Sequence, residues 1–352
     1  MKKPNLFIVG AARSGTTTLW QILKENPRVF MPDNLMLKEP AHFSECRKLR
    51  FHHYDKYKKI FEKANENHLW VGEASTAYLT DPVSSRKIFQ YNPDARIIII
   101  LRNPVLRAYS LYRWMVQDGY EYANTFEDAL SLEESRRKKE IPNFFEPEYY
   151  YNYLYFNSGK YYHQVKRYLR LFKENVIILK FENFINNFSQ EYGRICEFLG
   201  ISQNSFNITK TNESHDVVSP VQQFILRKIT QFYLSNYENL KRKNNRTEFK
   251  NAFIEELSKN IIQLKKVTHI GIFQKMRLLS IIEKVVKRLS SGEWELKKDT
   301  IQNRDIIMKC GLKKKFSKRI KEETAFNLKK KYRDDILQLC QYTGIDFSGW
   351  VV

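Results

Sequence analysis

The sequence predicts a doubly wound α/β domain with a parallel sheet and a P-loop-like phosphate-binding loop, together with a helical C-terminal segment. Three observations predict this fold. The chain opens with a short apolar run, a loop that contains two glycines, and a stretch with helical periodicity. Continuous apolar runs then occur at 96–101 and 176–179, which is typical of strands buried on both faces of a parallel sheet. After residue 219 only helical periodicity remains.

Each expected element has a local signal of apolar spacing or of a breaker residue. In chain order, the expected elements are a strand at 5–9, a helix at 17–25, a strand at 96–101, a helix at 105–116, a helix at 161–172 and a strand at 176–179. Asn103-Pro104 ends the second of these strands, because a proline at that point favours the start of a helix. The alternation of strands and helices indicates parallel strands joined by helical crossovers.

The last third of the chain is predicted to be a basic helical segment, residues 220–352, that packs on a core formed by residues 1–219. Residues 225–335 hold 29 Lys and Arg against 13 Asp and Glu, a net charge of +16 within a chain total of +21. Such a surface attracts phosphate, sulfate, acidic glycans, nucleic acid or anionic lipid. No nucleic-acid partner is expected. The stretch 276–289 is both amphipathic and basic, so it fits either a packing helix or a helix that lies on a membrane surface.

Composition excludes several classes of protein. With 42% hydrophobic residues, 12 Gly and 10 Pro in 352 residues, the chain is neither collagen-like nor of low complexity. The longest aliphatic run is 97–101, whereas a membrane-spanning helix needs about 20 apolar residues. The four cysteines are scattered without metal-binding spacing, and the N-terminal apolar stretch is too short for a signal peptide. We therefore expect a cytoplasmic protein with free thiols and without a metal site.

The sharpest motif is the loop GAARSGTTT, which lies between the first strand and the first helix. Gly10 and Gly15 have the spacing of a P-loop, in which backbone N–H groups and a helix N-terminus surround a phosphate. The lysine that follows the second glycine in a P-loop is missing, because Thr16 stands there. This argues against an ATP-dependent kinase and leaves Arg13, inside the loop, as its cation.

A second basic element occurs in RIIIILRNPVLRAYS, where Arg102 ends a strand and Ser110 lies on the following helix. Together with the loop motif RSGTT, it resembles the two donor-binding signatures of sulfotransferases that use 3′-phosphoadenosine-5′-phosphosulfate (PAPS). The resemblance implies that Arg102 and Ser110 bind the 3′-phosphate, since a guanidinium and a hydroxyl suit a phosphate dianion. It further implies that the 5′-phosphosulfate is bound by Arg13, Ser14, Gly15, Thr16 and Thr17.

The resemblance also implies a general base. Residues 38–43 (KEPAHF) are similar to the K-E-x-x-[FYH]-F element of carbohydrate-type and bacterial members, so Glu39 is the expected base. His42 is the alternative, because some branches use a histidine and a free imidazole titrates near pH 6.5. Lys38 is expected to help screen the sulfuryl group, and Arg13 to contact the charge that develops on the departing phosphate.

Residues 72–78 (GEASTAY) are similar to a further family segment, G-E-x-[ST]-P-x-Y, with Thr76 in place of the proline. For Glu73, a structural hydrogen-bonding role and a contact with the acceptor both remain open.

The family resemblance implies sulfuryl transfer from PAPS to a hydroxyl of a carbohydrate or glycolipid, with PAP as product. The segment 220–352, onto which the resemblance carries no residue roles, is expected to contribute to acceptor binding. A P-loop kinase of small molecules and a non-catalytic binder of acidic polymers or membranes are the alternatives, and the sequence does not identify the acceptor.

Overall fold

The computed structural model describes residues 2–34, 37–45, 53–117, 120–121, 123, 125–138, 150–204, 255, 287 and 319–352. The chain divides into two compact units. The first unit combines Met1–Leu111, Glu148–Glu213 and Ile320–Val352, and the second combines Tyr112–Pro147 and Ser214–Arg319. The predicted boundary at residue 219 lies outside the described residues. Residues 320–352, which we expected in the helical segment, belong to the first unit.

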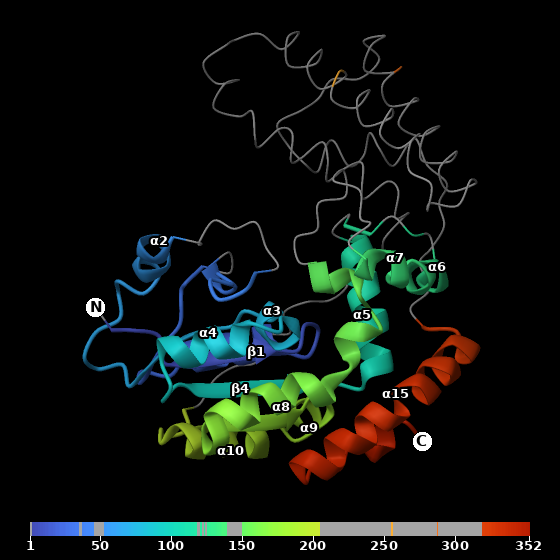
Figure 1. Ribbon diagram of the computed structural model, residues 1–352. Helices are drawn as coiled ribbons and strands as arrows, with labels where there is room; N and C mark the ends of the chain where they lie inside the picture. The colour runs from blue at the N-terminus through green and yellow to red at the C-terminus, as the bar shows by residue number, and fades with distance from the viewer. Residues whose placement is uncertain are drawn as a thin grey trace. The chain divides into compact units, whose positions relative to one another are not determined.

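The first unit is built on a five-stranded sheet in the order β2-β3-β1-β4-β5, with every neighbouring pair parallel (Figure 1). The strands are β1 (Leu6–Gly10), β2 (Val29–Phe30), β3 (Trp70–Glu73), β4 (Arg96–Leu101) and β5 (Val176–Lys180). The three predicted strands and the parallel sheet are confirmed. The short strands β2 and β3 were not predicted, because two to four residues carry no readable pattern.

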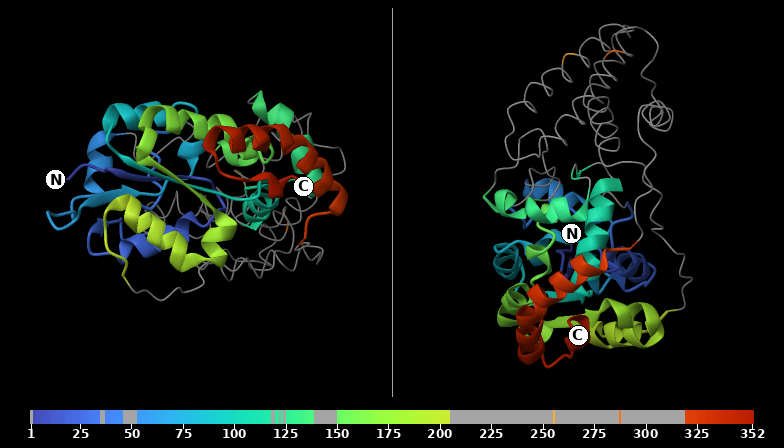
Figure 2. Two further views of the ribbon diagram at one scale, coloured as in Figure 1. Left: turned by 90° about the horizontal axis from the view of Figure 1, so that it is seen from below. Right: turned by 90° about the vertical axis from the view of Figure 1, so that its right-hand side faces the viewer.

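Helices cover both faces of this sheet, as the left view of Figure 2 shows. On one face, α1 (Thr16–Lys24) and α10 (Phe188–Leu199) pack against the sheet around Ile8 and Ile98. On the other face lie α3 (Ala77–Thr80), α4 (Ser84–Tyr91) and α8 (Tyr161–Phe172). Residues 97–101 of β4 are fully buried, so the doubly wound architecture is confirmed. The shorter elements are α2 (Tyr54–Lys59), α9 (Phe181–Asn186), η3 (Tyr150–Tyr153), η4 (Asn157–Gly159), η5 (Lys173–Asn175) and η6 (Ser348–Trp350).

The C-terminal helix α15 (Glu322–Thr343) packs on α8. Tyr332 is fully buried, and its hydroxyl donates to the Phe156 carbonyl at 2.9 Å. Asp335 Oδ2 accepts the Tyr161 N–H at 2.7 Å, so a carboxylate of α15 satisfies a free amide at the start of α8. A C-terminal helix is thus present as predicted. Most of the segment 220–319, including the amphipathic stretch at 276–289 apart from residue 287, lies outside the described residues.

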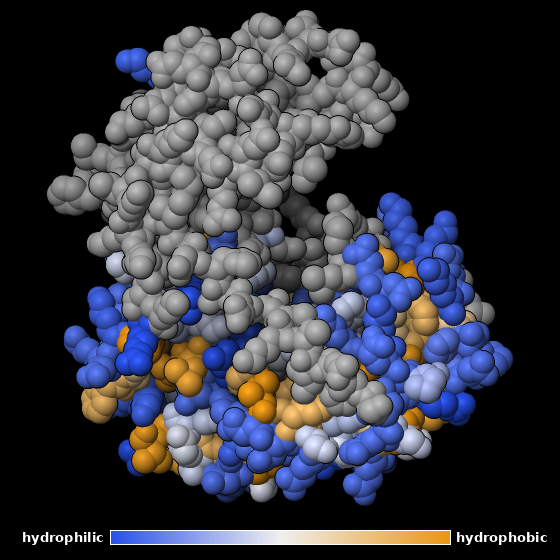
Figure 3. Space-filling model, turned by 180° about the vertical axis from the view of Figure 1, so that it is seen from behind, coloured by the Kyte–Doolittle hydropathy of each residue, from blue (hydrophilic) through white to orange (hydrophobic). Residues whose placement is uncertain are grey.

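The face seen in Figure 3 is largely hydrophilic over the described residues, with hydrophobic residues between them in small groups. Phe326 and Leu337 of α15 are among the exposed large hydrophobic side chains. No helix in the described part of the chain combines the length and the apolar character that crossing a bilayer requires.

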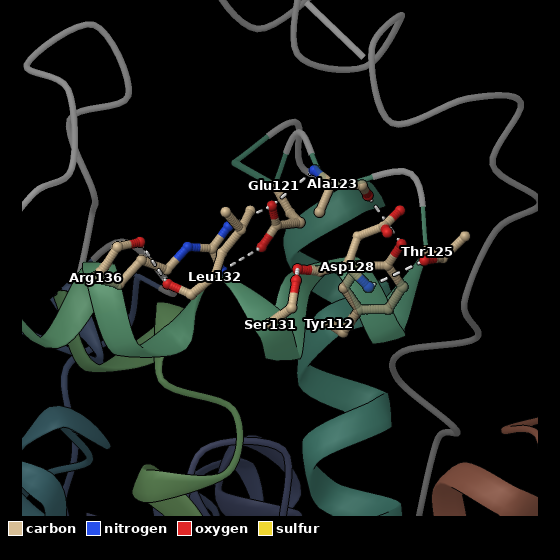
Figure 4. Close-up of polar contacts among 9 residues, drawn as sticks. Tyr112, Glu121, Ala123, Thr125, Asp128, Ser131, Leu132 and Arg136 are labelled. Atoms are coloured by element: carbon tan, nitrogen blue, oxygen red, sulfur yellow. Dashed lines mark hydrogen bonds and ion pairs between the residues drawn. The ribbon is translucent and has the colours of Figure 1, made fainter. Parts of the chain in front are cut away.

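The second unit contains a buried ion pair (Figure 4). Its described helices are α6 (Phe126–Ser131) and α7 (Glu133–Arg137), while α5 (Pro104–Gln117) belongs partly to each unit in sequence. Both terminal guanidinium nitrogens of Arg136, Nη1 and Nη2, donate to the Glu121 carboxylate, at 2.9 and 2.8 Å, and each side chain is at most 2% exposed. Glu121 also accepts the Ala123 N–H at 2.8 Å, and Tyr112 donates to the Ala123 carbonyl at 2.9 Å. The ion pair therefore ties the segment after α5 to α7.

Replacing Arg136 alone by methionine should destabilise the second unit by about 3–5 kcal/mol, because Glu121 would keep a buried charge without its counterion. The double variant Glu121→Leu/Arg136→Met should lose less stability, because it leaves no unpaired charge buried. Hydrogen–deuterium exchange of residues 125–138 reports this local stability. The matched control is Arg137→Met, which breaks the exposed pair with Glu134 and should cost under about 1 kcal/mol. A double variant less stable than Arg136→Met would contradict this account of the pair.

Candidate active site

The predicted phosphate loop lies at the carboxyl end of β1, the central strand of the sheet. The Ala11 N–H donates to the Ile100 carbonyl of β4 at 2.7 Å, and α1 begins at Thr16. Gly15 precedes this helix with φ +82°, a left-handed conformation in which a side chain would be strained. A Cβ at Gly15 would also lie 3.2 Å from the Phe181 ring, so the site accepts no larger residue without a shift.

Ser14 has the environment expected of an anion ligand. Its side chain is fully buried, and among the described residues its hydroxyl has no hydrogen-bond partner. An unsatisfied buried hydroxyl costs about 1–3 kcal/mol, so such groups usually bond to a ligand or to water. Ser14 lies at the N-terminus of α1, where backbone N–H groups favour a negative charge. These features fit a bound phosphate or sulfate oxygen.

The structure brings the two predicted donor-binding elements together. Arg102, which follows β4, donates from Nη1 to the Arg13 carbonyl of the loop at 3.0 Å. Ser110 on α5 lies 3.4 Å from Nε of Arg13, which donates to its hydroxyl. Arg13 has φ +68°, so the contact with Arg102 holds the loop in a conformation that non-glycine residues rarely adopt. Residues far apart in the sequence thus form one cluster of cations and hydroxyls.

Phe181 is a contact of this cluster that the sequence did not reveal. The guanidinium of Arg102 lies 4.7 Å from the centre of the Phe181 ring, in a cation–π arrangement. Burial lowers the pKa of Arg102, and the nearby Glu182 carboxylate opposes that shift. Phe181 directly follows β5, so the only available signal was its place at the same sheet edge as Arg102.

The expected base, Glu39, lies at the carboxyl end of β3, the other neighbour of β1. Its Oε1 accepts from Lys38 Nζ at 2.6 Å, and its Oε2 accepts from the Thr76 hydroxyl at 2.9 Å and the Thr76 N–H at 3.3 Å. Burial by itself raises the pKa of Glu39, but the Lys38 charge and the Thr76 donors outweigh it and lower the pKa below the usual value. The carboxylate therefore stays ionised at neutral pH.

Thr76 connects this carboxylate with the phosphate loop. A Cβ on Gly10 would lie 3.3 Å from the Thr76 carbonyl and 2.7 Å from Cβ of Leu79, so the start of α3 packs closely against the start of the loop. In the family segment G-E-x-[ST]-P-x-Y, a proline stands at the position of Thr76, and proline has neither an N–H nor a hydroxyl. Both bonds from Thr76 to Glu39 are therefore features of this chain.

Lys38 and His42 have different surroundings. Lys38 is 2% exposed, and its ammonium bonds to Glu39 and to the Ala74 carbonyl at 3.3 Å. The His42 ring is half-buried and stacks on Tyr57, with ring centres 4.3 Å apart and planes 9° apart. The structure thus joins Lys38 with Glu39 and gives His42 an aromatic environment. Within the described ranges, no group of three or more His, Cys, Asp or Glu is placed to hold a metal ion.

Comparisons with known proteins identify the family to which the chain belongs. A family model for the sulfotransferase domain matches residues 3–280. The chain is 31% identical over 121 residues to the membrane-associated sulfotransferase kil1 of Dictyostelium discoideum, which is 32% of this chain and 23% of that protein. It is 23% identical over 205 residues to heparan sulfate glucosamine 3-O-sulfotransferase 6 of Mus musculus, covering 57% of this chain and 53% of that protein. The chain thus spans about a quarter to a half of the length of these relatives.

Among solved structures, a sulfotransferase from Alicyclobacillus acidocaldarius is similar, with a TM-score of 0.52 and 26% identity. That similarity covers 78% of this chain and 100% of the other. The family model, the curated relatives and the fold agree, and the chain belongs to the sulfotransferase-domain family.

Proposed function

We propose that this sulfotransferase transfers the sulfuryl group of PAPS to a hydroxyl of an acceptor. The observation that carries the proposal is the cluster of Arg13, Arg102 and Ser110 beside the unsatisfied hydroxyl of Ser14. Two cations and two hydroxyls at a helix N-terminus suit a ligand with two phosphate-like groups. The missing P-loop lysine supports a donor other than ATP.

Each residue of the cluster has a proposed task. Ser14, Gly15, Thr16 and Thr17 bind the 5′-phosphosulfate through hydroxyls and backbone N–H groups, while Arg13 stabilises the charge that develops on the departing phosphate. The 3′-phosphate is bound by Arg102 and Ser110. PAPS supplies an activated sulfuryl group, so the protein's tasks are to orient the donor, to accept the acceptor's proton and to stabilise charge.

Glu39 is the proposed base. Its lowered pKa keeps it ionised, and Lys38 and Thr76 fix its orientation. The same contacts make it a weaker base than a free glutamate. His42 is the second candidate, since its half-buried imidazole lies on the same loop.

The acceptor we propose is a carbohydrate, free or as part of a glycolipid. The support is the similarity to the heparan sulfate 3-O-sulfotransferase, together with the net positive charge of the chain. Incubation with labelled PAPS and, in parallel, heparosan oligosaccharides, galactosylceramide vesicles, 4-nitrophenol and a tyrosine peptide tests the proposal. Label transfer to the last two probes alone would reject a carbohydrate acceptor. The cytoplasmic location and a membrane contact through 276–289 stay predictions.

The donor is tested by isothermal titration with PAP in EDTA, with ATP and Mg²⁺ as the comparison. We expect binding of PAP without a metal, and we expect Arg102→Ala to weaken it at least tenfold, since a charge-assisted hydrogen bond contributes about 1.5–3 kcal/mol. Arg86→Ala, which changes an exposed arginine, is the matched control and should bind PAP like the wild type. Binding of ATP but not PAP would replace the proposal with a kinase.

The base is tested by Glu39→Gln. We expect kcat to fall by about 10²–10⁴-fold while the affinity for PAP changes little, because the amide cannot take a proton. His42→Asn, assayed in parallel, is expected to keep most of the turnover. Full activity in Glu39→Gln together with a large loss in His42→Asn would assign the base to His42.

The environment of the base is tested by Thr76→Val, which keeps the side-chain shape but removes the hydroxyl that donates to Glu39. Losing this donor should raise the pKa of Glu39. Because the base must be ionised to act, the acidic limb of the pH profile of kcat should move to higher pH, whereas the wild type should stay active below the usual range of a glutamate. An acidic limb that stays at the wild-type pH would show that the ionisation of Glu39 does not set it.

A further inference from the structure

The loop that carries Glu39 is held from one side by the segment that follows β3. We name residues 38–43 the base loop and residues 73–78 the β3–α3 segment. Two amides of the base loop donate to hydroxyl oxygens of the β3–α3 segment: Ala41 N–H to Ser75 Oγ at 2.8 Å, and Phe43 N–H to Tyr78 Oη at 3.3 Å. Both hydroxyls are fully buried, so their hydrogen bonds must be made within the protein.

Glu73 accepts hydrogen bonds from both of these hydroxyls and is itself fully buried. Its Oε1 accepts from the Tyr57 hydroxyl at 2.8 Å and from the Tyr78 hydroxyl at 2.9 Å, and its Oε2 accepts a short hydrogen bond from the Ser75 hydroxyl. One carboxylate thus accepts hydrogen bonds from three side-chain hydroxyls.

The direction of these hydrogen bonds decides whether each hydroxyl can accept an N–H of the base loop. A hydroxyl has one proton to donate and two lone pairs that accept. Because the hydroxyls of Ser75 and Tyr78 donate their hydrogen bonds to Glu73, the lone pairs of each oxygen remain available to accept an N–H of the base loop.

We propose that Glu73 is a positioning residue for the base loop. By accepting hydrogen bonds from the hydroxyls of Ser75 and Tyr78, it orients both oxygens as acceptors that fix the backbone of the loop that carries Glu39. This inference rests on the proposed role of Glu39 as base.

The backbone of the base loop needs such support. Ala41 has φ +50°, a left-handed conformation that is unfavourable for a non-glycine residue. It lies two residues after Glu39, is fully buried, and carries the N–H that Ser75 accepts. The hydrogen bond to Ser75 therefore acts at the strained position of the loop, where a relaxed backbone would displace the carboxylate.

This role requires an ionised Glu73. Burial and, to a smaller extent, the neighbouring Glu39 charge raise the pKa of Glu73 to about 7, although the hydrogen bonds from three hydroxyls act against this shift. Buried Tyr57 and Tyr78 keep their protons, since burial and the Glu73 charge raise the pKa of each. Three neutral donors around one acceptor make a network whose proton directions are fixed while Glu73 is ionised.

The test compares four variants of the full-length protein: Glu73→Gln, Ser75→Ala, Tyr78→Phe and Tyr57→Phe. Glu73→Gln replaces one acceptor oxygen by a donor, and the next two each remove one hydroxyl that holds the base loop. Tyr57→Phe is the matched control, because it removes a bond to Glu73 while the ring that stacks on His42 stays. The readouts are hydrogen–deuterium exchange of residues 37–45, kcat with the acceptor that takes label from PAPS, and the Kd of PAP.

We expect Glu73→Gln, Ser75→Ala and Tyr78→Phe to speed exchange in residues 37–45 at least tenfold and to lower kcat at least tenfold. The Kd of PAP should stay within about threefold of the wild type, and exchange in β4 should be unchanged. Tyr57→Phe should show smaller effects in both readouts. Unchanged exchange in residues 37–45 for Ser75→Ala and Tyr78→Phe would overturn the proposal, even if Glu73→Gln did not fold. A loss of PAP affinity parallel to kcat would also overturn it, because it would indicate general damage.

Failure of this inference can be told from failure of the proposed function. If the wild type transfers no label from PAPS, the function is wrong, while the exchange measurement still decides whether Glu73 orders the base loop. If Glu39→Gln loses turnover but keeps wild-type exchange in residues 37–45, the chemical and positioning roles are separate, as proposed.

Discussion

The parallel pairing of β1 with β3 on one side and β4 on the other is the constraint on which the site depends. Parallel neighbours place their carboxyl ends at one edge, so the segments that follow three strands meet there. The loop after β1 brings Arg13 and Ser14, the turn after β4 brings Arg102, and the segment after β3 supports Glu39. Without β4 beside β1, Arg102 would not lie next to the phosphate loop, and without β3 beside β1, Glu39 would not.

At this edge of the sheet, contacts with other groups fix the positions of the charged side chains. Arg102 is held by a backbone carbonyl and an aromatic ring, and Glu39 by an ammonium and the two donors of Thr76. Such groups are costly to bury unless their partners are in place, so each arrangement admits few alternatives. The buried hydroxyl of Ser14, by contrast, has no hydrogen-bond partner among the described residues, which suits a group that binds a ligand.

Local patterns predicted the parts of the fold that rest on local physics. The aliphatic run of β4 and the helical spacing of α8 were enough to place both elements, and the glycine spacing was enough to place the loop at 10–18. The family motifs added Arg102 and Glu39, but their contacts needed the fold. No pattern could show that Tyr57 donates to Glu73, because a buried carboxylate is stable only through partners that lie elsewhere in the chain. Strand β3 was missed for a related reason, since its four residues include a glycine and end in a charge.

The attachment of α15 to α8 has a consequence for how the protein is made. The apolar face of α8 is synthesised well before α15, whose Tyr332 and Asp335 complete the packing and the hydrogen bonds at its start. At roughly 5–20 residues per second, the ribosome needs on the order of ten seconds to add the residues between 204 and α15. During that interval the nascent core exposes a surface that its own last helix later covers. A chain that ends within this stretch would therefore leave the apolar face of α8 uncovered. Chaperones bind exposed apolar surfaces of this kind.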